Sequence, residues 1–223
     1  MQNNSVEMFV LYHPEADQTV SRHLAWWLPA SESLRLLCGA DTIRHSVHAW
    51  NAEPCGVSGY SGPQSIHRLV EVMSRAAVSK CESVIVTEYD AVTFRAPPPH
   101  PLDGSIVAPL MTNENPGYYA CAQYPHPVWY MQCTTAQRIA RCAHMQPIDS
   151  EGGYGDRWLA ALCARLCIPI RNDPGVFSRD QDLLERNPDD LERARQCLRR
   201  GGWCIHGVKT ARVLDTLAQE VGR

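Results

Sequence analysis

The stretch "CESVIVTEYDAVTFRAPPPH", from Cys81 to His100, places an apolar run directly before two carboxylates, Glu88 and Asp90. The run is too short and too rich in β-branched residues for a helix, so it predicts a buried β-strand. The two acids then fall where this strand ends. They are either an ordinary strand end that meets water or part of a metal site.

Strand and helix patterns alternate on both sides of this stretch. The predicted strands are Glu7–His13, Ser33–Ala40, Ser83–Asp90, Gly104–Met111, Val128–Thr134 and the run "GGWCIHGVK". The predicted helices are Ala16–Leu28, Pro63–Lys80, Thr135–Met145, Tyr154–Leu166, Pro188–Arg199 and a short amphipathic tail from Thr210. The segment 51–62, "NAEPCGVSGYSG", predicts a loop. This alternation predicts one α/β/α sandwich domain over residues 1–223, with a mixed but mostly parallel sheet.

The composition is that of an ordinary globular protein, with 44% hydrophobic and 20% charged residues. A net charge of -3 gives no sign of a general nucleic-acid binder. No apolar run approaches the length of a membrane span, and the first residues lack a secretory signal pattern, so we expect a cytoplasmic protein. The ten cysteines include no CxxC pair, which favours reduced thiols over disulfides or a zinc site.

Two short motifs carry groups suited to a cation and a phosphate. In open α/β sheets, ligands bind beyond the carboxyl ends of the strands, where Glu88 and Asp90 are predicted to lie. Hard cations such as Mg²⁺ or Mn²⁺ are held by one or two carboxylates together with substrate phosphates. In "CIHGVKT", His206 could complete the coordination of Mn²⁺, Gly207 allows a sharp turn, and Lys209 could pair with a phosphate. The alternative is a histidine at a strand end and a solvated lysine.

Together, "VIVTEYDAVTF" and the late "HGVK" resemble the metal-dependent GT-A glycosyltransferases, whose fold is related to the Rossmann fold and whose donors are nucleotide-diphospho-sugars. The resemblance implies that Asp90 is a metal ligand, and that Glu88 contacts the donor ribose or reaches the metal through water. It also implies a further metal ligand in His206 and a phosphate contact in Lys209, although the spacing here is more compact than in the family. Glu88 in place of the family's usual Asp is a second departure.

The order of elements matches the same superfamily over most of the chain. The resemblance implies a nucleotide-binding part over about residues 1–100 and an acceptor-side part over about 101–223. In the superfamily the end of the first strand, here "LYHPEA", lies under the nucleotide base, which makes Tyr12 and His13 candidate nucleotide contacts. The resemblance implies a UDP- or GDP-linked donor and Mn²⁺ or Mg²⁺.

The segment "PIDSEGGYGDRW" contains the candidates for an acid that faces the acceptor. Asp156 would lie in the first turn of a helix, where an acid suits the helix dipole, and this alone accounts for it without any function. The resemblance implies instead that Asp156 deprotonates the acceptor hydroxyl in an inverting reaction, with Glu151 and Asp149 as substitutes. A late His–Lys pair is met more often in retaining members, so the stereochemistry stays open.

Two other classes of protein remain as alternatives. A metal-dependent nucleotidyltransferase usually carries a glycine-rich basic loop after its first strand, and "LYHPEADQTVSRH" has no glycine there. A non-catalytic α/β binding protein would carry the same acids as solvent-facing strand ends. The acceptor hydroxyl is also open: a saccharide, a lipid, a protein, a small molecule or a modified DNA base.

Overall fold

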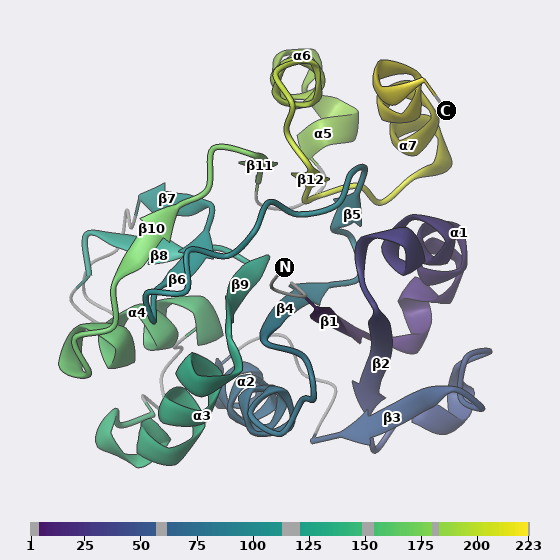
Figure 1. Cartoon of the computed structure of the whole chain (residues 1–223). Helices are drawn as coiled ribbons and strands as arrows, with labels where there is room; N and C mark the ends of the chain where they lie inside the picture. Colours follow the sequence, from purple (N-terminus) through teal and green to yellow (C-terminus); the bar gives the residue numbers. More distant parts are fainter. Residues whose placement is uncertain (1–4, 57–61, 113–120, 149–153, 180–182, 223) are drawn as a thin grey trace.

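The computed structural model describes residues 5–56, 62–112, 121–148, 154–179 and 183–222. A seven-stranded sheet lies at the centre, in the order β10-β6-β9-β4-β1-β2-β3 (Figure 1). β9 runs antiparallel to both of its neighbours, and the other neighbouring pairs are parallel. The strands are β1 (Val6–Tyr12), β2 (Ser33–Gly39), β3 (Ala52–Cys55), β4 (Ser83–Glu88), β6 (Ile106–Ala108), β9 (Trp129–Gln132) and β10 (Ile170–Asn172). The predicted α/β fold with a mostly parallel mixed sheet is confirmed.

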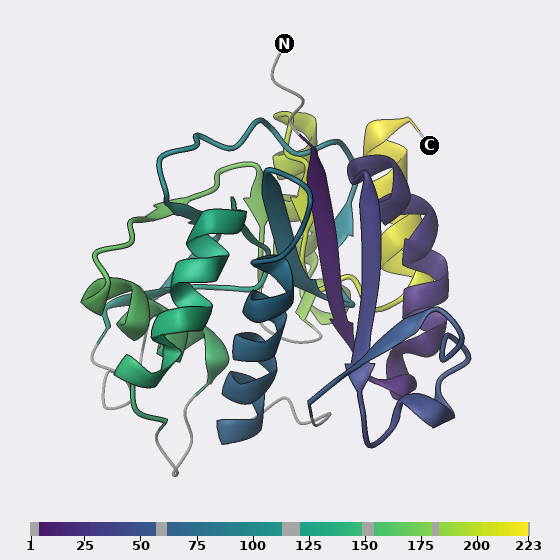
Figure 2. The same cartoon turned by 60° about the horizontal axis from the view of Figure 1, so that its bottom comes forward.

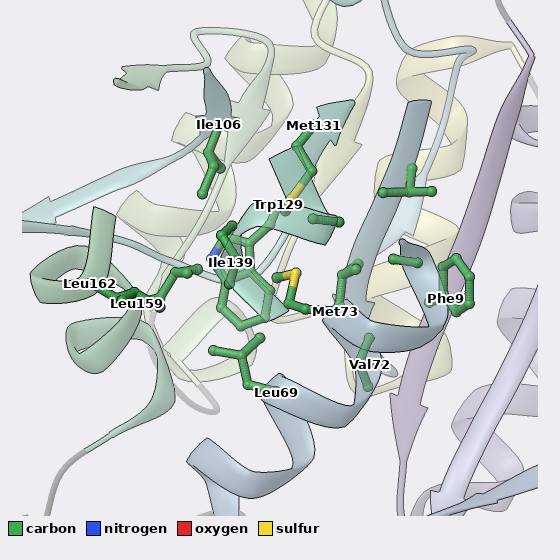
Figure 3. Packing of buried hydrophobic residues seen from close by; sticks show 14 of the residues in the cluster. Phe9, Leu69, Val72, Met73, Ile106, Trp129, Met131, Ile139, Leu159 and Leu162 are labelled. Carbon is green, nitrogen blue, oxygen red and sulfur yellow. The ribbon is translucent and has the colours of Figure 1, made fainter. Parts of the chain in front are cut away.

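Helices cover both faces of this sheet (Figure 2). Successive side chains of a strand point to opposite faces, so Phe9 and Leu11 of β1 belong to one buried cluster and Met8 and Val10 to the other. The first cluster packs against α2 (Gly62–Ala76), α3 (Cys133–Cys142) and α4 (Gly155–Arg165), as Figure 3 shows. The second packs against α1 (Asp17–Trp27). Burial on both faces explains the apolar runs Met8–Tyr12 in β1 and Val84–Val86 in β4.

The C-terminal segment adds a smaller unit beside α1. Its three-stranded sheet has the order β11-β12-β5, formed by Val176–Phe177, Cys204–Ile205 and Val92–Thr93. A third apolar cluster joins this sheet to α5 (Leu183–Arg186), α6 (Pro188–Arg199) and α7 (Ala211–Ala218). The remaining short elements are the β7–β8 hairpin pair (Leu110–Thr112, Gln123–Pro125) and the 3-10 turns η1 (Pro14–Ala16), η2 (Leu28–Ala30), η3 (Ile43–His45), η4 (Ala143–Met145) and η5 (Gln219–Val221).

Two local predictions need correction. The segment 51–62, predicted as a loop, contributes the edge strand β3, which tolerates Pro54 because an edge strand has one side without ladder hydrogen bonds. The single strand predicted over 104–111 is divided into β6 and β7 at Pro109, and the two halves join different sheets.

Two further observations concern the membrane and the thiols. Among the described helices, none combines the length and apolar character that a membrane crossing requires. Each of the ten cysteines is a free thiol.

Candidate metal and active site

The site is built where β4 ends, and the backbone brings a distant segment to it. Glu88 is the last residue of β4, and Asp90 lies in the turn that follows. The main-chain oxygen of Asp90 accepts hydrogen bonds from the N–H groups of Gly207 (3.1 Å) and Val208 (2.8 Å). Gly207 has φ +94, a conformation that favours glycine, and it lets the chain turn directly after His206.

The side chains of the two sequence motifs meet at this point. His206 Nε2 lies 3.1 Å from Asp90 Oδ1 and 3.7 Å from Glu88 Oε2. Lys209 Nζ lies 3.9 Å from Asp90 Oδ2. One candidate ligand atom from each of Glu88, Asp90 and His206 lies within 4.8 Å of the others. The structure therefore brings together all four residues that the sequence assigned to the cation and the phosphate.

Opposite charges determine the protonation states of the two buried candidate ligands, Asp90 and His206. Burial raises the pKa of Asp90, but the positive charges of His206 and Lys209 outweigh it and bring the pKa down to about 2. Burial lowers the pKa of His206, but the charges of Asp90 and Glu88 outweigh it and raise the pKa to about 10. Without a cation, the His206 imidazolium therefore balances the charge of the acids.

The donor set fits a divalent cation. Asp90 Oδ1 and His206 Nε2 are buried, and in the described part of the chain neither makes a hydrogen bond of acceptable geometry, despite lying 3.1 Å apart. Buried polar atoms are costly when they have no partner. An imidazole nitrogen and carboxylate oxygens that converge on one point are ligands that would gain a partner in a bound cation.

A cavity of about 260 Å³ opens beside these residues. Asp156 lines it from the first turn of α4, where the helix start lies close against α2: the N–H of Gly155 donates to Ser65 Oγ at 3.1 Å, and a Cβ on Gly155 would lie 3.3 Å from Ser65 O. Burial raises the pKa of Asp156 to about 6, and the charge of Glu88 acts in the same direction. A carboxyl group with this pKa is suited to general acid–base chemistry near neutral pH.

Two basic residues that line the cavity, His126 and Arg68, were not predicted as part of the site. His126 is buried beside Pro127, and its ring lies 4.7 Å from the ring of His206 in an edge-on arrangement. Arg68 of α2 is only 2% exposed, which is rare for an arginine. A charged residue beside the apolar positions Ile66 and Leu69 was the available sequence signal for Arg68.

The other predicted residues lie apart from this cavity or outside the described residues. Tyr12 is fully buried and its hydroxyl bonds to Ser46 Oγ at 2.9 Å. His13 caps η1 by accepting from the N–H of Glu15 at 3.3 Å. Neither is among the described lining residues, so their contact with a nucleotide stays a prediction. Glu151 and Asp149 fall outside the described residues.

Helix α1 holds the backbone of the acidic motif from the opposite side. His23 Nδ1 lies 2.8 Å from the main-chain oxygen of Tyr89, and Trp27 Nε1 donates to the main-chain oxygen of Ala91 at 2.7 Å. Since Gly207 and Val208 bind the oxygen of Asp90, the three consecutive carbonyl groups 89, 90 and 91 are all hydrogen-bonded. This arrangement fixes the direction in which the two acids project.

The chain matches no family model and no curated protein. Among solved structures it is similar to galactosyltransferase LgtC in complex with donor and acceptor sugar analogs, at 12% identity and a TM-score of 0.52. It is also similar to an active-site mutant of LgtC, at 10% identity and a TM-score of 0.51. Both matches cover 97% of this chain and 95% of LgtC. The chain therefore has the fold of the GT-A glycosyltransferases, as its sequence predicted.

Proposed function

We propose that this protein is a metal-dependent glycosyltransferase that moves a sugar from a nucleotide-diphospho-sugar to a hydroxyl acceptor. The observation that carries the proposal is the meeting of Glu88, Asp90 and His206 at one point beside a cavity. Lys209 and Asp156 line the same cavity. The chain shares its fold with LgtC, which was solved with donor and acceptor sugar analogs. This similarity supports a sugar donor and favours a saccharide acceptor.

Each residue then has a chemical task. Asp90, His206 and Glu88 would hold Mn²⁺ or Mg²⁺, which as a Lewis acid neutralises the diphosphate leaving group. Lys209 adds a positive charge for the same phosphates. Asp156 accepts the proton of the acceptor hydroxyl, since a carboxyl group of pKa about 6 is ionised at neutral pH. With Asp156 in that role the reaction inverts the anomeric centre, and a retaining reaction would need a different role for Asp156.

A donor-hydrolysis screen tests the proposal. We expect one UDP- or GDP-linked sugar to be hydrolysed slowly by the parent protein with Mn²⁺, and the rate to fall at least about 100-fold with EDTA or in Asp90→Asn, because the leaving group loses its counter-charge. The exposed acid Asp189 supplies the matched control, Asp189→Asn, which should keep the parent rate.

Other results of the screen would contradict the proposal. Consumption of a nucleoside triphosphate with release of pyrophosphate would identify a nucleotidyltransferase. Binding of a nucleotide-sugar without turnover, with every acceptor class tried, would identify a binding protein.

A further inference from the structure

The guanidinium group of Arg157 lies over two tyrosine rings at the edge of the cavity. Arg157 is in the first turn of α4, and its Cζ atom is 5.1 Å from the ring centroid of Tyr154 and 5.2 Å from that of Tyr124 in β8. Tyr124 is only 5% exposed, whereas Tyr154 is 49% exposed and lines the cavity. Aromatic faces attract a cation and remove part of its water. The two rings therefore hold the positive charge of Arg157 at the rim.

Arg157 differs from the other half-buried arginines of the described residues, which bond to an acid or to main-chain oxygens. These are Arg35, Arg75, Arg179 and Arg195, which pair with carboxylates, and Arg95, which donates to two main-chain oxygens. In the described part of the chain, the side chain of Arg157 has neither kind of partner and contacts the two rings instead. The N–H donors of a guanidinium lie in its plane, so contacts with aromatic faces leave them available to an oxyanion.

The same residue adjoins the acid that we propose as the catalytic base. The main-chain N–H of Arg157 donates to Asp156 Oδ1 at 2.7 Å. Burial raises the pKa of Asp156, and the positive charge of Arg157 opposes this rise. Neighbouring side chains of a helix are about 100° apart around its axis, so Asp156 lines the cavity while Arg157 lies over the rings. An acceptor whose hydroxyl meets Asp156 therefore has Arg157 within reach of another of its groups.

We propose that Arg157, held by Tyr124 and Tyr154, binds a negatively charged group of the acceptor, which is a carboxylate or a phosphate on the saccharide that receives the sugar. A guanidinium that two rings already orient loses little side-chain freedom when it binds an anion. Its planar donors match two oxygen atoms of either group. The inference rests on the proposed function and narrows its acceptor from a saccharide to an anionic saccharide.

The first test measures binding without donor, metal or turnover. ¹H–¹⁵N spectra of the arginine side chains are recorded with EDTA while glucuronic acid, glucose 6-phosphate or glucose is added at constant ionic strength. The Arg157 signal, assigned by its absence in Arg157→Lys, should shift saturably with at least one of the two acids and stay in place with glucose. The acid with the lower dissociation constant distinguishes a carboxylate site from a phosphate site.

An internal control accompanies this titration. Arg165 is exposed in the last turn of the same helix, and its signal should not shift. The absence of a saturable shift at Arg157, or an equal shift at Arg165, would overturn the proposal.

The second test compares acceptors during turnover, with the donor that the hydrolysis screen identifies. Each pair of acceptors differs in one group, as a glucuronide or a 6-phosphate differs from the matching glucoside. The parent should use the acidic member about 10–100-fold more efficiently in kcat/KM, as expected of hydrogen bonds to a charged group. Arg157→Gln should lose this preference through KM. Arg157→Lys should recover only part of it, because an ammonium group lacks the planar fork.

A matched variant and a stability measurement identify a packing role. Arg165→Gln, at the other end of α4, should keep the parent's preference for the acidic acceptor. If Arg157 only packs on the rings, Arg157→Gln would lower the melting temperature and leave the ratio of kcat/KM values unchanged. That result would overturn the proposal.

The outcomes separate this inference from the proposed function. Transfer with equal efficiency to acidic and neutral acceptors would overturn the role of Arg157 and leave the glycosyltransferase standing. A parent protein that hydrolyses no nucleotide-sugar and transfers to no acceptor would overturn the proposed function and with it the acceptor role. The spectra would still decide whether Arg157 is an anion site.

Discussion

A single partly buried carboxyl group, that of Asp156, sets the pH response that we expect of this protein. The pKa of Asp156 is raised from 3.8 to about 6, so the folded chain binds this proton more tightly than the unfolded chain does. Folding stability from this group is therefore greatest below pH 3.8 and decreases as the pH rises through 6. Asp156→Asn removes the cost of the buried charge, and should raise the free energy of unfolding at pH 8 by about 1–3 kcal/mol.

Urea unfolding at two pH values checks this expectation. The gain from Asp156→Asn should be several-fold larger at pH 8 than at pH 4, while the proposed glycosyl transfer should be lost together with its base. Asp215→Asn is the control, since the Asp215 carboxyl group is exposed on α7 and is hydrated in both the folded and the unfolded chain. A stability gain of equal size at both pH values would contradict the account of a buried charge.

The residues of the site differ in how far the sequence could predict them. Glu88, Asp90 and Lys209 carry local signals, because they follow apolar runs at strand ends. His126 carries none, since what makes it part of the site is its contact with His206, which lies far along the chain. Ser178 carries no local signal either, because the two rings that its hydroxyl contacts, those of His126 and His206, belong to separate segments. Only the fold brings such residues together.

At the scale of elements, the sequence predicted long elements well and short ones poorly. The bounds of α6 were predicted without error, because Asn187 caps the helix and Pro188 begins it. β5, β11 and β12 have two residues each, which is too short for any periodic pattern. Their positions depend on the strands with which they pair. The sequence therefore predicted only one strand of the small sheet that carries His206 to the site.

The bracing of the acidic turn by α1 is open to test. Trp27→Phe keeps most of the buried ring and removes the N–H that binds Ala91 O. We expect a loss of about 1–3 kcal/mol in unfolding free energy, because a buried carbonyl group loses its partner. We also expect Mn²⁺ affinity to fall several-fold, because the turn that aims Asp90 is loosened. Thermal unfolding and Mn²⁺ titration measure the two effects.

A matched variant separates the effect on the orientation of Asp90 from the effect on stability. Ile139→Val trims the apolar cluster on the opposite face of the sheet and should cost about 0.5–1.5 kcal/mol. Its Mn²⁺ affinity should equal that of the parent. If both variants weaken Mn²⁺ binding in proportion to their loss of stability, α1 supports the fold and has no special effect on the acids.

At the scale of the whole molecule, the proposed metal site is assembled by interactions that need no metal. The C-terminal segment is joined to the rest by an apolar cluster and by backbone hydrogen bonds, from Phe94 N to Trp203 O (2.7 Å) and from Gly207 N to Asp90 O (3.1 Å). The His206 imidazolium then takes the place of a cation beside Asp90. EDTA should therefore leave the circular dichroism spectrum unchanged, unlike in proteins whose fold depends on a metal.

Adding the metal should stabilise this preformed site by mass action. Mn²⁺ at about 100 times its dissociation constant adds about 2.7 kcal/mol, which corresponds to about 5–10 °C in melting temperature for a domain of this size. Asp90→Asn should lose this rise, whereas Asp189→Asn at the exposed start of α6 should keep it. Unfolding by EDTA alone would show that the metal organises the C-terminal segment, because the contacts seen here would then be too weak to hold His206 against Asp90.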